Sequence, residues 1–333
     1  MQSRWAGADR VRTALVLIPG SINHFYNLNG RRVAEALREL GFAVDVHTLA
    51  TCPPREYDWC VLVNITEVAV SAGDGSAGLE QIRTLGQRWR AVASCALDCV
   101  ATTWFEALYN ACLVANVGTI LDLGLVDQRP HVLERARGAY HFVSAGLTTS
   151  ERRQLDTLEG AADQRPIPWA FIGHCTPHRA ALVDYLLQVV DPRGFVYMPL
   201  LAPYTEKDSP HLNQQQFERV LRLTRYQFWC SHHHHFYMEP ERFRTSLLTG
   251  SVPVKIMESR TVLPRAAPFD YLIVAEEDLP EWISKGPFDQ VRQRFRQDFR
   301  QLPSLRDGLA AYLVQAGILR PDETPVPQRA LAG

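Results

Sequence analysis

The segment 226–256 places polar residues where a phosphate group could bind. Its pattern indicates a short buried strand (YQFWC), a polar loop with four consecutive histidines, a helix that begins near Pro240, and a second buried strand. Glu239, Glu241 and Arg242 would then lie in the first turn of the helix, where free backbone N–H groups point outward and anions are favoured. The pattern therefore predicts an anion site after this strand.

A second loop of this kind follows the strand predicted at 169–173. The sequence FIGHCTPHR places Arg179 near the start of the next helix. A planar guanidinium is well matched to phosphate oxygens, so Arg179 is another candidate for binding an anion. The alternative is an arginine on a solvated helix face. We favour the site, because ligands of open parallel sheets bind at the carboxyl ends of strands.

A third loop, PGSINHFYNLNG, lies between the first predicted strand and the first helix and contains His24. It lacks the G-x-G-x-x-G pattern, so a dinucleotide site loses its main support. An imidazole suits general-base catalysis because its unperturbed pKa is near neutral pH. The alternative for His24 is a surface histidine with a local hydrogen bond. Glu67 and Asp98, each just after a predicted strand, are rival bases, and a carboxylate needs a raised pKa to compete.

The histidine run 232–235 has a metal-binding alternative. Adjacent histidines of an extended chain point to opposite sides, so only alternate ones could share an ion. No Cys or carboxylate at metal-ligand spacing accompanies them. We therefore predict no metal site and no cofactor, and expect His234 to line a pocket near the phosphates. An exposed loop without a role is the other possibility.

The composition excludes several classes of protein. The net charge is −1 and the sequence pI is about 6.8, so nothing indicates a surface for nucleic acid or acidic membranes. Seven cysteines without a C-x-x-C pair indicate a reduced intracellular protein rather than a disulfide framework. No apolar run is long enough to span a membrane, and the N-terminus does not have the pattern of a signal peptide. We expect a cytoplasmic protein with a small-molecule or glycan partner.

Strands and helices alternate along the whole chain. The predicted strands cover 13–19, 42–48, 58–64, 91–97, 119–123, 169–173, 194–200, 226–230, 252–256 and 269–275. The predicted helices cover 30–40, 78–88, 102–115, 147–157, 180–190, 213–223, 240–249, 287–301 and 304–316. This alternation implies parallel sheets with helices on both faces and right-handed crossovers.

The best linker candidate is 158–168, because LEGAADQRPIP is rich in Gly, Ala, Pro and charge. The sequence thus predicts an α/β protein of two Rossmann-like domains that face a cleft. These domains would span 1–160 and 167–318, followed by a Pro-rich flexible tail at 319–333.

The first loop resembles the N-terminal loop of GT-B glycosyltransferases. In that group a Gly-His pair follows the first strand, and the next helix ends in Leu-x-x-x-Gly-His-x-Val; the similar residues here are Gly20, His24 and the segment 37–44. The resemblance implies that His24 deprotonates an acceptor hydroxyl. It also implies that the first domain binds the acceptor and the second domain binds a nucleotide sugar.

The second loop resembles a segment of fucosyltransferases that use GDP-fucose. There a strand is followed by Ser-Asn-Cys and then by an arginine that begins a helix; this chain has Gly173, His174, Cys175 and Arg179. The resemblance implies that Arg179 neutralises the donor diphosphate.

The third loop is similar to the fucosyltransferase signature and to exostosin-like GT-B enzymes, whose helix ends before a Val-Pro-Val or Pro-Val strand. The similar residues are Tyr226–Phe228, Glu241, Arg242 and Val252–Val254. The resemblance implies that Glu241 binds ribose hydroxyls and that Arg242 binds the diphosphate. The E-x7-E pattern of retaining GT-B enzymes is not completed here, which favours inversion at the anomeric carbon.

The sequence therefore predicts an inverting, metal-independent glycosyltransferase that moves a sugar from a GDP, UDP or dTDP donor to a hydroxyl acceptor. The predicted catalytic residues are His24, Glu67 and Asp98, and the predicted donor-binding residues are Gly173, Arg179, Tyr226, His234, Glu241, Arg242 and Ser251. A non-catalytic protein that binds sugar nucleotides or glycans on the same scaffold is the main alternative. A His-rich metal-binding protein is a third.

Overall fold

The chain forms two compact units. The first contains Met1–Thr148 and Pro303–Gly333, and the second contains Thr149–Leu302. The structure is a computed structural model that describes residues 11–20, 24–158, 164–199, 212–231, 235–258 and 268–323.

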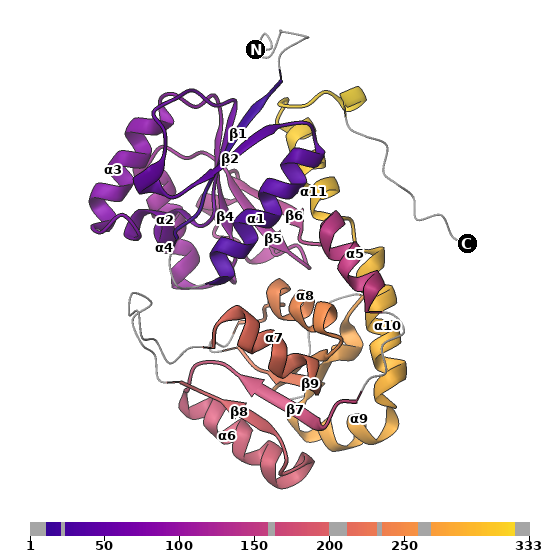
Figure 1. Cartoon of the computed structure of the whole chain (residues 1–333). Coiled ribbons are helices and arrows are strands. Elements are labelled where there is room, and N and C mark those ends of the chain that lie inside the picture. Colours follow the sequence, from indigo (N-terminus) through magenta and orange to yellow (C-terminus); the bar gives the residue numbers. More distant parts are fainter. Residues whose placement is uncertain are drawn as a thin grey trace. The chain divides into compact units, whose positions relative to one another are not determined.

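These units differ from the ranges expected from the sequence. Helix α5 (Thr149–Thr157) belongs to the second unit, and helix α11 (Leu305–Gln315) belongs to the first. Figure 1 shows α11, in yellow, beside the indigo helix α1 (His24–Glu39). Leu319, which we expected in a flexible tail, is buried in the same unit.

The first unit is built on a six-stranded parallel sheet in the order β2-β1-β3-β4-β5-β6. The strands are β1 (Thr13–Leu17), β2 (Ala43–His47), β3 (Trp59–Leu62), β4 (Val92–Ala96), β5 (Ile120–Gly124) and β6 (Tyr140–Ser144). Each neighbouring pair is parallel, as the alternation of strands and helices predicts.

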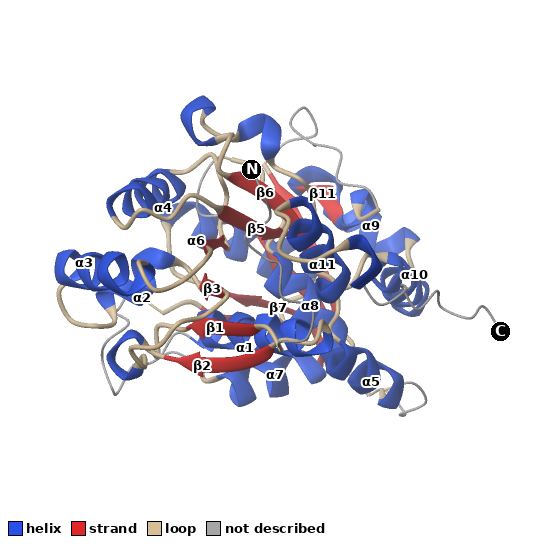
Figure 2. Cartoon of the chain, turned by 90° about the horizontal axis from the view of Figure 1, so that it is seen from above, coloured by secondary structure: helices blue, strands red, loops and turns tan. Residues whose placement is uncertain are grey.

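Helices cover both faces of this sheet (Figure 2). Helices α1 and α11 lie on one face. The other face carries α2 (Ile65–Val70), α3 (Gly75–Gly86) and α4 (Thr103–Val114). This arrangement is a Rossmann-like domain.

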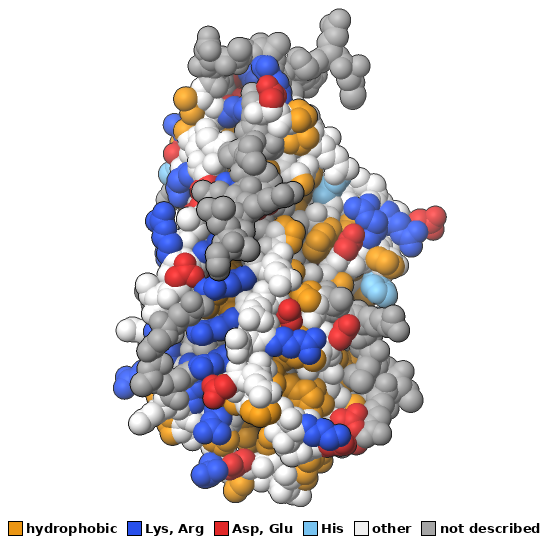
Figure 3. Space-filling model, turned by 90° about the vertical axis from the view of Figure 1, so that its right-hand side faces the viewer, with side chains coloured by type: hydrophobic (Ala, Val, Ile, Leu, Met, Phe, Trp, Pro, Cys, Tyr) orange, Lys and Arg blue, Asp and Glu red, His pale blue; other side chains and the backbone are white. Residues whose placement is uncertain are grey.

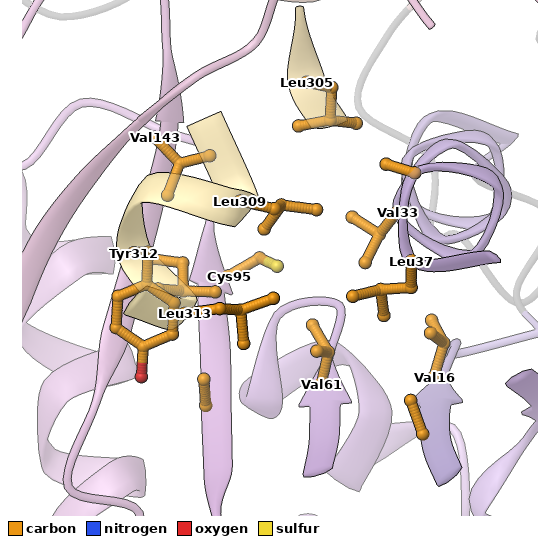
Figure 4. Packing of buried hydrophobic residues seen from close by; sticks show 14 of the residues in the cluster. Val16, Val33, Leu37, Val61, Cys95, Val143, Leu305, Leu309, Tyr312 and Leu313 are labelled. Atoms are coloured by element: carbon orange, nitrogen blue, oxygen red, sulfur yellow. The ribbon is translucent and has the colours of Figure 1, made fainter. Parts of the chain in front are cut away.

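The apolar stripe of α11 explains why this helix joins the first unit. Leu305, Leu309 and Leu313 recur every four residues, so they lie on one side of the helix and are fully buried. Figure 4 shows them against Val33 and Leu37 of α1, together with side chains of the sheet. Each buried leucine contributes about 1.5–3 kcal/mol to stability, which is enough to fix the helix here.

A buried carboxyl group lies within the same unit. Asp122 on β5 is fully buried, and its Oδ2 accepts hydrogen bonds from the Tyr140 hydroxyl at 2.6 Å and from Gln128 Nε2 at 3.3 Å. Burial raises the pKa of Asp122 to about 7, although the two hydrogen bonds oppose this shift. The group is therefore largely protonated in the folded protein at pH 6.

Asp122→Asn is expected to flatten the pH dependence of stability. Because the folded pKa lies above the unfolded value of 3.8, the contribution of Asp122 to stability is full below that value and is lost as pH rises towards 7. The difference between the folded and unfolded pKa values corresponds to a loss in the free energy of unfolding on the order of 4 kcal/mol. Urea unfolding between pH 4.5 and 8 measures it. Asp127→Asn, a half-exposed neighbour, should keep most of the dependence, and an unchanged profile in Asp122→Asn would contradict the assignment.

The second unit is built on a five-stranded parallel sheet in the order β11-β10-β9-β7-β8. The strands are β7 (Ile167–Ile172), β8 (Phe195–Tyr197), β9 (Thr224–Trp229), β10 (Val252–Met257) and β11 (Ile273–Ala275). Besides α5, the helices are α6 (Pro177–Tyr185), α7 (Gln214–Arg222), α8 (Pro240–Thr249), α9 (Leu279–Lys285) and α10 (Phe288–Gln301), with a π-helical turn at Leu186–Val190. This unit is also Rossmann-like.

Charges of both signs are interspersed on the face shown in Figure 3. Several arginines of α10 are paired with carboxylates of the second unit, including Arg294 with Asp298 and Arg300 with Asp156. Such pairs match the even charge balance of the sequence. Among the described residues, no helix is long and apolar enough to cross a membrane.

Candidate functional site

The candidate site lies at the carboxyl ends of β7 and β9. From β7 the chain proceeds to β8 on one side of it and then to β9 on the other. A reversal of this kind in an open parallel sheet leaves a crevice between the loops that follow the two strands. The loop after β7 begins at Gly173, and the loop after β9 begins at Cys230.

Arg179 joins these two loops. Thr176 is the N-cap of α6 and accepts a hydrogen bond from the Arg179 backbone N–H at 3.3 Å, which fixes the residue in the first turn. The buried guanidinium donates through Nη1 to the His174 carbonyl at 3.2 Å and through Nη2 to the Cys230 carbonyl at 2.8 Å. Its Nε has no hydrogen-bond partner among the described residues. Arg179 is thus a buried cation with donor capacity left over.

Arg242 reaches the same place from α8. Its Nη1 donates to the Ile172 carbonyl at 2.9 Å, and its Nε is ion-paired with the Glu239 carboxylate. The guanidinium carbon lies 5.4 Å from the ring centre of Trp229, at the end of β9. Arg242 therefore lies at the carboxyl ends of β7 and β9.

The two guanidiniums lie close to Gly173, which has no side chain. A Cβ atom here would lie 3.1 Å from Arg179 Nη1 and 3.8 Å from Arg242 Nη2, so glycine leaves the space that both cations occupy. Burial, and then the neighbouring charge of Arg242, lower the pKa of Arg179. Holding two like charges together costs stability, and such an arrangement is typical of a site that binds an anion.

Lys255 is a third cation that we did not predict from the sequence. It lies on β10 and is almost fully buried; its Nζ donates to Ser231 Oγ at 2.6 Å and to the Tyr237 carbonyl at 2.8 Å. The ammonium also lies 4.1 Å from the ring centre of Trp229. The signal was a lysine within the apolar strand VPVKIM, where a charge is rarely buried without a reason. We call Arg179, Arg242 and Lys255 the cation cluster.

Glu241 lies in a different network. Its carboxylate is ion-paired with Arg244 and accepts a hydrogen bond from Thr245 Oγ1 at 2.8 Å. Arg244 also donates to Glu151 of α5 at 2.8 Å. Burial would lower the pKa of Arg244, but the two glutamates raise it above the usual value. Glu241, which we expected to bind ribose, is thus part of a buried ion triad with Arg244 and Glu151 that connects α5 to α8.

Arg244→Met is expected to destabilise the protein by about 3–5 kcal/mol, because it leaves two glutamates without their buried counter-ion. Chemical unfolding monitored by tryptophan fluorescence measures this loss. Arg222→Met is the matched control, since Arg222 is paired with Glu218 at the surface and should cost less than about 1 kcal/mol. Equal effects of the two substitutions would show that the triad adds nothing.

Two other predicted donor-binding residues do not lie at the carboxyl ends of the strands. Tyr226 is buried near the start of β9, with its ring stacked on Phe228 and in edge contact with Trp282 and Phe288. Ser251 is buried just before β10, at the amino end of the strand and therefore at the end opposite the candidate site. Both side chains belong to the interior of the unit. His234 lies outside the described residues.

The three candidate bases follow strands of the first unit. Glu67 lies in the first turn of α2 after β3, and Asp98 follows β4, the neighbouring strand. Burial raises the pKa of the half-buried Glu67. Asn64 caps α2 with a positive φ of 65°, which is uncommon for a residue other than glycine. His24 begins α1, and its side chain lies outside the described part of the chain.

Within the described residues, no group of three or more His, Cys, Asp or Glu side chains could hold a metal ion.

No protein-family model and no curated protein matches this sequence. Among solved structures, the chain is similar to an alpha-glucosyltransferase in complex with UDP and a 13-mer DNA containing a central A:G mismatch, with a TM-score of 0.56 and 10% sequence identity. The match covers 92% of this chain and 100% of that chain. This chain has a GT-B-like fold.

The likeness confirms the fold class predicted from the sequence, since a GT-B glycosyltransferase has two Rossmann-like domains. At this level of identity it supports the glycosyltransferase fold but not the finer resemblance to fucosyltransferases or exostosin-like enzymes.

Proposed function

We propose that the protein is a glycosyltransferase that moves a sugar from a nucleotide diphosphate sugar to a hydroxyl acceptor. The observation that carries this proposal is the pair Arg179 and Arg242, held next to Gly173 at the carboxyl ends of β7 and β9. A diphosphate offers the charge and the planar sets of oxygens that two guanidiniums recognise.

The cation cluster would act mainly on the leaving group. When the sugar departs, negative charge develops on the diphosphate, and cations already in place stabilise it without reorganising. The N-terminus of α8 adds to this effect. Three cations can balance a diphosphate without a divalent metal, so we keep the proposal of a metal-independent reaction that needs no cofactor.

Glu67 is our first choice for the base that activates the acceptor hydroxyl. A carboxylate becomes a better base when its pKa rises towards the working pH, and burial has this effect on Glu67. Asp98 and His24 stay as rivals. We also propose inversion of the anomeric carbon, which follows when the acceptor hydroxyl displaces the diphosphate in a single step.

The similar alpha-glucosyltransferase is in complex with UDP and DNA. Its UDP supports a nucleoside diphosphate as the ligand of this chain. We propose a small molecule or glycan as the acceptor, as the charge balance suggests, and a DNA duplex belongs among the acceptors to be tested. The seven cysteines, all within the described residues, form no disulfide, which suits the proposed cytoplasmic location.

Thermal unfolding with UDP, GDP and dTDP tests the donor class. A ligand at a free concentration of 100 times its dissociation constant stabilises the native state by about 2.7 kcal/mol. At least one of the three nucleotides should therefore raise the melting temperature. The same nucleotide's sugar conjugates should then release the diphosphate when an acceptor is added. No stabilisation by any of the three would contradict the proposal. Stabilisation without turnover over a broad acceptor panel would favour a non-catalytic binding protein.

A further inference from the structure

We propose that Glu239 is a resident counter-ion of the cation cluster that competes with the donor diphosphate for Arg242 and so limits the affinity for donor and product. This inference rests on the proposed function and assigns a role to a carboxylate that the reaction scheme above does not use.

The contacts of Glu239 set it apart from an ordinary helix cap. It is the N-cap residue of α8, yet its side chain makes no capping hydrogen bond. Its carboxylate is instead ion-paired with Arg242 Nε. The side chains of Glu239 and Arg242 are 25% and 17% exposed, so the pair is accessible to a ligand from solvent.

The charge of Glu239 is retained at neutral pH. Burial would raise the pKa of this carboxyl group, but Arg242, Lys255 and Arg179 together lower it below its usual value. The carboxylate is thus an anion that is paired with Arg242 and stabilised by the nearby charges of Lys255 and Arg179, the same three cations that we assign to the diphosphate. One negative charge already balances part of the cluster before any ligand arrives.

A diphosphate can compete with Glu239 for Arg242. Arg179 and Lys255 are almost fully buried, whereas the pair of Glu239 and Arg242 is partly exposed, so a ligand from solvent can reach this pair. A diphosphate has more charge and more acceptor oxygens, so it can displace the carboxylate from Arg242. The Glu239 charge then stays nearby and repels the ligand, which weakens binding and speeds the release of the nucleoside diphosphate product.

The opposite role makes the opposite prediction. If Glu239 accepted hydrogen bonds from hydroxyl groups of the donor, its charge would strengthen binding. The sign of the effect of Glu239→Gln therefore separates the two.

The test is isothermal titration of the wild type and Glu239→Gln with UDP, GDP, dTDP and inorganic pyrophosphate. Removing one unit charge close to the diphosphate should tighten binding at least tenfold, because at an effective dielectric constant of about 20 the repulsion of two unit charges about 12 Å apart already corresponds to a tenfold change. Glu218→Gln is the control, because Glu218 is paired with Arg222 on α7 and should leave every affinity unchanged. Weaker or equal affinity in Glu239→Gln would overturn the inference.

A double-mutant cycle with Arg242→Met excludes an indirect effect on folding. If Glu239 acts by occupying Arg242, the gain from Glu239→Gln should be smaller in the Arg242→Met background than in the wild type, because only the through-space repulsion remains there. A gain of equal size in both backgrounds would overturn the competition.

The failures of the two proposals are distinguishable. Nucleotide binding that weakens in Glu239→Gln would overturn the role of Glu239 and leave the donor class standing. Pyrophosphate binding that tightens, without binding of any nucleotide, would support Glu239 and contradict the nucleotide donor. No binding of any probe by either protein would overturn both.

Discussion

Arg179→Met is expected to reduce the affinity for the nucleoside diphosphate at least about 30-fold. A charge-assisted contact in a buried site loses about 2–5 kcal/mol when one partner is truncated. Arg179 is 3% exposed, so solvent cannot replace its contacts. Its Nη atoms also hold the loops after β7 and β9 together, through the His174 and Cys230 carbonyls. The substitution removes both the charge and this connection.

Isothermal titration with UDP, GDP and dTDP measures the loss. Arg179→Lys should lie between wild type and Arg179→Met, because it keeps the charge but cannot bridge the two carbonyls in the same way. Arg193→Met is the matched control in the same unit, since Arg193 is exposed and pairs with Asp191. Retention of full affinity in a folded Arg179→Met protein would remove this residue from the site.

Glu67→Gln is expected to lower turnover at least 100-fold while leaving donor affinity unchanged. General-base catalysis contributes about 10²- to 10⁴-fold, and the amide cannot accept the acceptor's proton. The burial that raises the pKa of Glu67 also predicts that wild-type turnover falls as the pH drops below this raised value. Steady-state rates from pH 4.5 to 8, together with nucleotide titration, measure both effects.

Asp98→Asn and His24→Ala are the comparison variants for this prediction. Each should keep turnover within a few-fold of wild type if Glu67 is the base. Full turnover in Glu67→Gln, with a loss in one of the other two, would transfer the role to that residue.

The elements of the fold and their packing follow from local sequence only in part. Apolar runs alternating with helices predicted parallel sheets with covered faces, and the structure has them. Strand β6 was missed because YHFVS is short and half polar, without the apolar run that marks its neighbours. Helix α11 was predicted, but its stripe of leucines does not specify which sheet it covers. That choice depends on packing against α1, far away in the sequence.

The same distinction applies to the candidate site. Arg179 and Arg242 could be predicted because a position just after a strand is a local property. Glu239 and Glu241 both lie near the start of α8, and sequence spacing alone did not show which one faces the cluster. Glu241 is turned towards Arg244, whose other partner is Glu151, 93 residues away. Tyr226 was predicted by motif similarity, which does not specify at which end of a strand a residue lies, and Ser251 precedes its strand rather than following it.

A crystal soaked with a mixture of UDP-, GDP- and dTDP-sugars tests the central claim most directly, because density would show base, diphosphate and sugar together. We predict that the diphosphate lies within hydrogen-bond distance of the Arg179 and Arg242 guanidiniums, next to Gly173. A nucleotide bound elsewhere, with no contact to either arginine, would contradict it.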